Sequence, residues 1–230
     1  MIPSAPERRK SLLDQRFRSA TARHGLYCFP AAGGAAPRYA GWSDHFRGPV
    51  ELVPVRPPGP PGTIRPAPAE VDGLADELAA EISSAHTRPM LLGHRAGAVL
   101  ALEVARRLEE LGRPATHLFV SGRAAPPPAR TARSLSLLPR LPAGPVTTRT
   151  RHHRPAPPLS CPVFAWCGSS DPEVGPSALQ GWAAETTAGL KLFVRPGGRS
   201  FLAHHVDEVV RVVHEAAARF DGAARPAAVT

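Results

Sequence analysis

The chain has 230 residues, 43% of them hydrophobic, which suits one domain built around a single core. Its formal net charge is +9, with only two lysines (Lys10 and Lys191) among 28 basic residues, and no helix-turn-helix, zinc-finger or RNA-binding sheet motif accompanies that charge. The 3 cysteines are odd in number and lack C-x-x-C spacing, no signal-peptide core is present, and no apolar run reaches roughly 18 residues. We therefore expect a cytoplasmic protein with no metal or other cofactor, no nucleic-acid partner and no membrane partner.

Strands and helices alternate along the predicted chain. Hydrophobic runs and helical periodicity predict strands at 25–30 and 49–55, a helix at 69–85, a strand at 89–92, a helix at 97–111, strands at 116–120, 162–166 and 190–194, and a final helix at 206–220. Such alternation is typical of an α/β fold with a mostly parallel, doubly wound sheet. We expect residues 1–24 to be a flexible basic segment, 25–222 to form the domain, and 223–230 to be a C-terminal tail.

One long stretch of the chain contains no acidic residue. From Leu111 to Ser170 there is no Asp or Glu, against eight arginines and eleven prolines. This composition does not favour a core, so we expect a mobile basic insertion at 122–160 that covers the mouth of the sheet and is cut by trypsin. Two interpretations of its arginines stay open: docking of an acidic partner helix, or a solvated loop.

The segment Gly93-His94-Arg95-Ala96-Gly97 lies between a predicted strand and a long predicted helix. This is the context of the nucleophile elbow G-x-S-x-G, in which small flanking residues permit a sharp turn that lifts the central side chain above the sheet. Arginine takes the central position here. Because a protonated guanidinium has no lone pair available for attack, Arg95 cannot form an acyl-enzyme.

Five blocks of the sequence resemble, in the same order, those of type II thioesterases, which are α/β-hydrolases that release acyl groups from the carrier proteins of polyketide and nonribosomal peptide assembly lines. The blocks are CFPAAGG at 28–34, PMLLGHRAGAVLALEVARRLEELG at 89–112, LFVSGRAAP at 118–126, CPVFAWCGSSDPEV at 161–174 and RPGGRSFL at 195–202. The resemblance implies an α/β-hydrolase fold whose lid insertion, at about 122–160, is shortened and rich in Pro and Arg.

The resemblance also implies where the catalytic groups would lie. It places the nucleophile at Arg95, the acid at Asp171 and the general base at Arg199, where the family has histidine. The oxyanion donors would be the backbone N–H groups of Ala32 and Ala96. Asp171 is then the retained member of the triad, and we expect it to form an ion pair with Arg199. Loss of the Ser-His unit costs on the order of a million-fold in turnover.

Three histidines are secondary candidates for a role in the site. His204 and His205 follow the base position and are candidates to replace it, although a place at the start of a surface helix is the commoner role. His94 is expected to pack behind the elbow. Arg95 itself keeps two interpretations: an anion clamp for a phosphate or carboxylate, or a relic in a site that is no longer used.

The sequence therefore predicts a thioesterase-like protein of a polyketide or nonribosomal peptide pathway that lacks hydrolase activity. Its predicted role is to bind an acidic acyl- or peptidyl-carrier protein, a synthase module or the tethered intermediate. One alternative is non-hydrolytic chemistry, such as cyclisation or elimination, in the arginine-lined pocket. A second is a residual editing thioesterase with a displaced nucleophile, for which Ser121, Ser169 and Ser200 are the nearest candidates.

Overall fold

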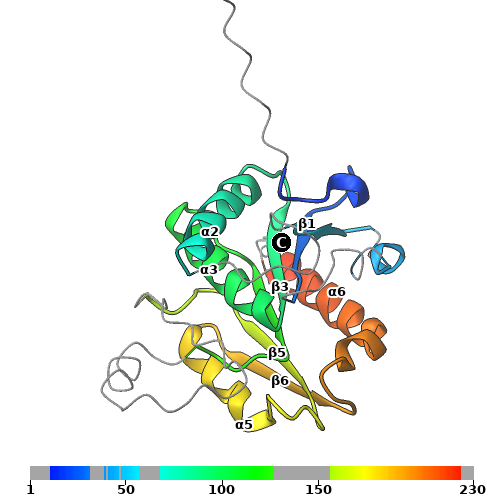
Figure 1. The fold of residues 1–230 in the computed structure, drawn as a ribbon. Coiled ribbons are helices and arrows are strands. Elements are labelled where there is room, and N and C mark those ends of the chain that lie inside the picture. The colour runs from blue at the N-terminus through cyan, green and yellow to red at the C-terminus, as the bar shows by residue number, and fades with distance from the viewer. Residues whose placement is uncertain are drawn as a thin grey trace, which may run out of the picture.

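The computed structural model describes residues 11–31, 39, 41–46, 48–56, 68–126 and 156–223, and its centre is a 6-stranded sheet. The strands are β1 (His24–Phe29), β2 (Val50–Pro54), β3 (Arg88–His94), β4 (His117–Ser121), β5 (Val163–Gly168) and β6 (Leu190–Arg195). Their order is β2-β1-β3-β4-β5-β6, with every neighbouring pair parallel. The predicted parallel α/β sheet is confirmed (Figure 1).

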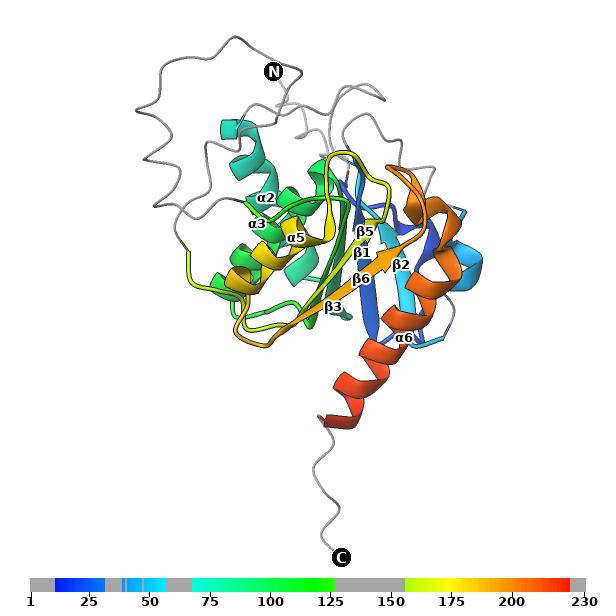
Figure 2. The same ribbon diagram turned by 90° about the horizontal axis from the view of Figure 1, so that it is seen from below.

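Helices cover both faces of this sheet. The helices are α2 (Pro68–Ser83), α3 (Ala96–Glu110), α5 (Pro176–Leu179) and α6 (Val206–Ala223), and the 3-10 turns are η1 (Gln15–Phe17), η2 (Ser43–His45), η3 (Gln180–Glu185) and η4 (Phe201–His204). Figure 2 shows α2, α3 and α5 on one face and α6 on the other. Successive residues of β1 alternate accordingly: Tyr27 packs in the cluster with α2 and α3, and Cys28 packs in the cluster with α6.

The N-terminal segment differs from the flexible segment expected before residue 25. Its described part, from residue 11, lies along the end of β2, where Leu13 forms an antiparallel bridge with Val55 and the Asp14 N–H donates to Pro54 O at 2.8 Å. The Asp14 carboxylate is buried and accepts from Arg16 and Arg56, and hydrogen bonding from Arg16 is the largest effect that lowers its pKa to about 2. These contacts hold the described part of the segment on the domain.

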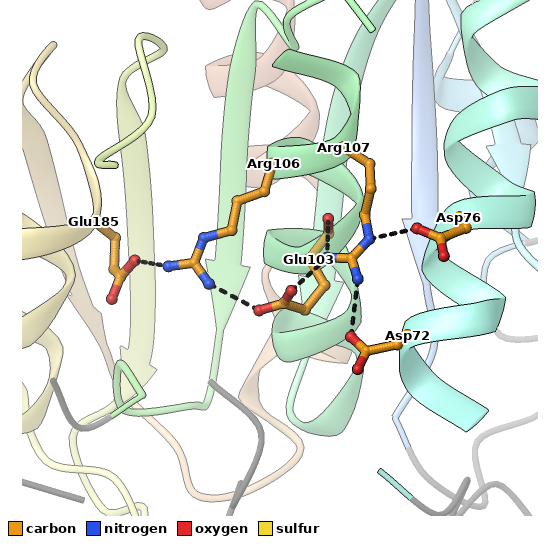
Figure 3. A network of polar contacts seen from close by, with 6 residues as sticks. All are labelled: Asp72, Asp76, Glu103, Arg106, Arg107 and Glu185. Atoms are coloured by element: carbon orange, nitrogen blue, oxygen red, sulfur yellow. Dashed lines mark hydrogen bonds and ion pairs between the residues drawn. The ribbon is translucent and has the colours of Figure 1, made fainter. Parts of the chain in front are cut away.

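A network of ion pairs fixes α3 to its neighbours. Its members are Asp72, Asp76, Glu103, Arg106, Arg107 and Glu185 (Figure 3). Arg106 lies between Glu103, at 2.8 Å, and Glu185 of η3, at 2.6 Å, and all three side chains are buried. Arg107 reaches Asp72 and Asp76 of α2, each at 2.8 Å. Because α3 starts at the predicted elbow, this network also fixes the direction in which the helix leaves that turn.

Candidate active site

The predicted elbow is a tight turn between β3 and α3. A Cβ on Gly93 would lie 2.4 Å from the Ala98 Cα, and one on Gly97 would lie 2.3 Å from the Phe29 carbonyl oxygen, so neither position accommodates a side chain. Arg95, between them, has φ 53° and ψ −116°, and it is the one non-glycine residue with positive φ among those the structure describes. The turn therefore keeps the strained backbone of a nucleophile elbow although arginine occupies its tip.

The Arg95 side chain binds two carboxylates. Its Nη2 lies 2.7 Å from Asp171 Oδ2, and its Nη1 lies 3.0 Å from Glu173 Oε2. The Asp171 side chain is fully buried, and the Arg95 side chain is only 14% exposed. The position that the resemblance assigns to the nucleophile is thus occupied by a paired cation, and the assigned acid accepts a charged hydrogen bond from it.

The loops after β5 and β6 bring the acid and base positions to the same edge of the sheet. A Cβ on Gly168 would lie 2.2 Å from the Gly197 carbonyl oxygen, and the Ser170 N–H donates to that oxygen at 3.0 Å. These glycines let the two loops touch. Asp171 follows in the first loop and Arg199 follows in the second, and Glu173 of the first loop forms ion pairs with both Arg95 and Arg199.

The pairing of these charges differs from the sequence-based expectation. Arg199 pairs with Glu173, its Nη1 lying 2.6 Å from Glu173 Oε1. Asp171 is paired with Arg95 instead. The expected ion pair between Asp171 and Arg199 is therefore wrong. The physical reason is reach, because an arginine at the elbow is long enough to contact the buried acid directly. The sequence analysis did not single out Glu173. It lies two residues after Asp171, the first acidic residue after the acid-free stretch from Leu111 to Ser170, and this proximity to the predicted acid could have identified it.

A third arginine lies beside this cluster. Arg123, just after β4, is half-buried, and the Trp182 ring N–H donates to its carbonyl oxygen at 2.9 Å. Burial lowers the pKa of Arg123, with a smaller lowering by the charge of Arg95 and an opposing effect of Glu173. Arg95 and Arg199 thus pair with Asp171 and Glu173 at the carboxyl end of the sheet, and the charge of Arg123 interacts with those of Arg95 and Glu173.

The histidines occupy separate positions. His94 is buried, and its Nδ1 lies 3.0 Å from the Ser121 Oγ, which is fully buried. His94 therefore packs behind the elbow, and its partner serine has no surface open to a substrate. His204 is exposed on η4, and a ring nitrogen of His205 lies 3.0 Å from the Pro196 carbonyl oxygen. Neither of these two contacts Asp171 in the part of the chain that the structure describes.

Some predicted features lie outside the described residues. Ala32, one proposed oxyanion donor, is among them, and so are residues 127–155 of the expected insertion. Ala96, the other donor, is the first residue of α3. Within the described ranges, no group of His, Cys, Asp and Glu side chains is arranged to hold a metal ion, and none of the helices could cross a membrane.

Comparisons with known proteins identify the family of the chain. A family model for the thioesterase domain matches residues 24–143. The chain is 30% identical over 221 residues to thioesterase TesA of Mycobacterium marinum, a match that spans 80% of this chain and 87% of that protein. It is 28% identical over 217 residues to the gramicidin S biosynthesis protein GrsT of Aneurinibacillus migulanus, over 80% of this chain and 85% of that protein.

A further relative is much longer than this chain. The AMB antimetabolite synthetase AmbE of Pseudomonas aeruginosa is 29% identical over 247 residues, which is 93% of this chain but 12% of that protein. Among solved structures, the type II thioesterase BorB from the borrelidin biosynthetic cluster aligns with a TM-score of 0.70 and 27% identity, over 90% of this chain and 97% of that chain. The resemblance drawn from the five sequence blocks is confirmed. The chain belongs to the thioesterase family, among the type II thioesterases of polyketide and nonribosomal peptide biosynthesis.

Proposed function

We propose that this chain is a thioesterase-family protein that has lost thioester hydrolysis and is retained to bind carrier-tethered intermediates of a polyketide or nonribosomal peptide pathway. The observation that carries the proposal is Arg95 at the tip of the elbow, with its guanidinium bound to Asp171. A guanidinium cannot attack a carbonyl carbon, and Arg199 at the base position cannot accept a proton at neutral pH.

Retention of the elbow argues for binding and against decay of the site. A non-glycine residue in this backbone conformation costs roughly 1–3 kcal/mol and persists only where its surroundings enforce it. Here the flanking glycines and the pairing of Arg95 with a buried carboxylate enforce it. The enforced turn supports a site that still binds a ligand although cations occupy the nucleophile and base positions.

The comparisons support the class of partner. The solved relatives include a thioesterase from the borrelidin cluster and one from the prodiginine pathway of Streptomyces coelicolor, the second with a TM-score of 0.65 and 27% identity. Carrier proteins are generally acidic, so a chain with net charge +9 is electrostatically complementary to them. In this proposal the carrier presents its phosphopantetheine arm to the edge of the sheet where Arg95 lies.

The buried Ser121 and His94 pair supports one competing function. A serine hydroxyl 3.0 Å from an imidazole nitrogen is the arrangement of an activated nucleophile, so a displaced-nucleophile thioesterase is the second candidate. It ranks below the first because Ser121 is fully buried, and a substrate could reach it only after the elbow had moved.

The test is to incubate the protein with a carrier protein loaded with an acyl-phosphopantetheine group and to follow the carrier by intact mass. We expect the acyl mass to persist and a complex to be detected. Arg95→Ser combined with Arg199→His should raise hydrolysis measurably above the parent, while neither single change should suffice, because a serine and its base act as one unit.

Two controls separate the candidates. If the parent protein hydrolyses the thioester at enzyme-like rates, and Arg95→Ala leaves that rate unchanged, the loss-of-hydrolysis proposal is wrong. Loss of that activity in Ser121→Ala would then identify the displaced nucleophile.

A further inference from the structure

The carboxylate of Glu173 lies between two arginines. Its Oε2 is 3.0 Å from Arg95 Nη1, and its Oε1 is 2.6 Å from Arg199 Nη1. Oε2 accepts a hydrogen bond from Arg95, and Oε1 forms an ion pair with Arg199. The two arginines thus flank one carboxylate, with one charged hydrogen bond and one ion pair.

The two carboxylates bound by Arg95 differ sharply in exposure. The Asp171 side chain is fully buried, whereas the Glu173 side chain is 51% exposed and that of Arg199 is 58% exposed. The Glu173 backbone N–H donates to Asp171 Oδ1 at 3.0 Å, which anchors the main chain of the loop while the side chain extends toward solvent. Asp171 is thus the enclosed partner of Arg95, and Glu173 is the partner that solvent can reach.

The surroundings favour an anion at this point. Arg95 is the N-cap of the 15-residue helix α3, and its Nη1 also approaches the Gly122 carbonyl oxygen, at 3.5 Å, beside the half-buried Arg123. With Glu173 turned away, Arg95 would keep Asp171 as a partner, and Arg199 would lose its ion pair with Glu173. The edge of the sheet would then lose one negative charge beside these arginines, and an external carboxylate would restore it.

We propose that Arg95 and Arg199 form a receptor for the carboxylate group of a ligand, and that Glu173 occupies this receptor when no ligand is bound. The inference rests on the proposed function, because it names the chemical class that the site would bind: an acyl intermediate that carries a free carboxylate. Exposed ion pairs are weak, so a ligand carboxylate can displace Glu173 without disturbing the buried pair of Arg95 with Asp171.

The experiment measures binding of malonate to the folded chain by isothermal titration calorimetry, at constant pH and constant ionic strength because surface charges are screened by salt. Glu173→Gln removes the internal carboxylate but preserves the size of the side chain. Because an intramolecular competitor acts at an effective concentration in the millimolar range, we expect this variant to bind malonate at least about tenfold more tightly than the parent. Adding Arg199→Gln, at an exposed position, should abolish the gain.

The chain offers a matched control on α6. Glu215 also bridges two arginines, at 2.6 Å from Arg211 and 3.5 Å from Arg219, but all three lie on the outer surface of a helix. Glu215→Gln should therefore leave malonate binding unchanged. An equal gain in this control, or no gain in Glu173→Gln, overturns the receptor.

Inorganic phosphate is the second probe, and it identifies the chemical class. Tighter binding of malonate than of phosphate to Glu173→Gln supports the carboxylate assignment, and the reverse order overturns it. Malonate binding does not depend on hydrolysis. A failure of the receptor is therefore distinguishable from a failure of the proposed function, which is measured on loaded carrier.

Discussion

Two arginines, Arg95 at the N-cap of α3 and Arg106 within that helix, have different surroundings. Arg106, in the second half of the helix, is bound by Glu103 and Glu185, and no side chain of the three is more than 8% exposed. Arg95, at the start of the helix, has one buried carboxylate partner and one that is half exposed. An ion pair whose partners are all buried can only stabilise the fold. An ion pair with one exposed partner can exchange that partner for a ligand. Exposure, not residue type, separates the structural cluster from the candidate site.

The largest expected effect is the loss of stability when the buried cluster of Glu103, Arg106 and Glu185 is broken. Arg106→Met removes the cation that binds the buried carboxylates of Glu103 and Glu185, and it should lower the free energy of unfolding by about 3–5 kcal/mol. Urea denaturation at pH 7 measures this. Arg211→Ala, which removes an exposed pair with Glu215, is the control and should cost at most about 1 kcal/mol. Equal losses in the two variants would show that burial does not distinguish these pairs.

Acid should weaken the fold through a group that belongs to neither cluster. His117 is buried beneath α6 among Phe119, Phe164 and Phe220, and burial lowers its pKa to about 4. Its ordinary pKa is 6.5, so between about pH 6.5 and pH 4 the unfolded chain binds more protons than the folded chain. Stability should be constant with respect to His117 above pH 6.5 and fall by on the order of 3 kcal/mol as the pH drops toward 4.

Urea denaturation measured across this pH range tests the histidine effect. The matched variant is His117→Phe, which keeps an aromatic ring at that position but cannot be protonated, so its stability should vary much less between pH 6.5 and pH 4. If both proteins lose the same stability on acidification, the pH dependence of unfolding does not come from His117. The carboxylates of the two arginine clusters then become the candidates for its source.

Much of this fold follows from local patterns in the sequence. Residues 89–112 combine a buried strand, two glycines and an amphipathic helix, and each of these features constrains its own neighbours in the chain. The elbow could therefore be predicted before any distance was known. The resemblance to a thioesterase added the approximate positions of the acid and the base, because family order fixes which loops follow β5 and β6.

The pairing of charges could not be predicted in the same way. Arg95, Arg199, Asp171 and Glu173 allow more than one set of ion pairs, and the choice depends on side-chain reach and burial in three dimensions. Transfer of the family pattern led to the pair of Asp171 with Arg199, since it assumes a small nucleophile at the elbow. The N-terminal segment shows the same limit: its contacts rest on backbone hydrogen bonds and on the buried Asp14, which a basic composition does not reveal.

The smallest expected effect concerns the two arginines of the candidate site, Arg199 and Arg95. Arg199→Ala removes only an exposed partner of Glu173 and should cost at most about 1 kcal/mol in unfolding free energy. Arg95→Ala removes the charged donor of the fully buried Asp171 and should lower the free energy of unfolding by about 1.5–3 kcal/mol. The substitution does not relieve the backbone strain, because alanine is also unfavourable at φ 53°. Thermal or urea denaturation of both variants at pH 7 measures the difference. A loss in Arg199→Ala as large as in Arg95→Ala would mean that Glu173 holds the loop as firmly as Asp171 does, and a carboxylate held that firmly could not give way to a ligand.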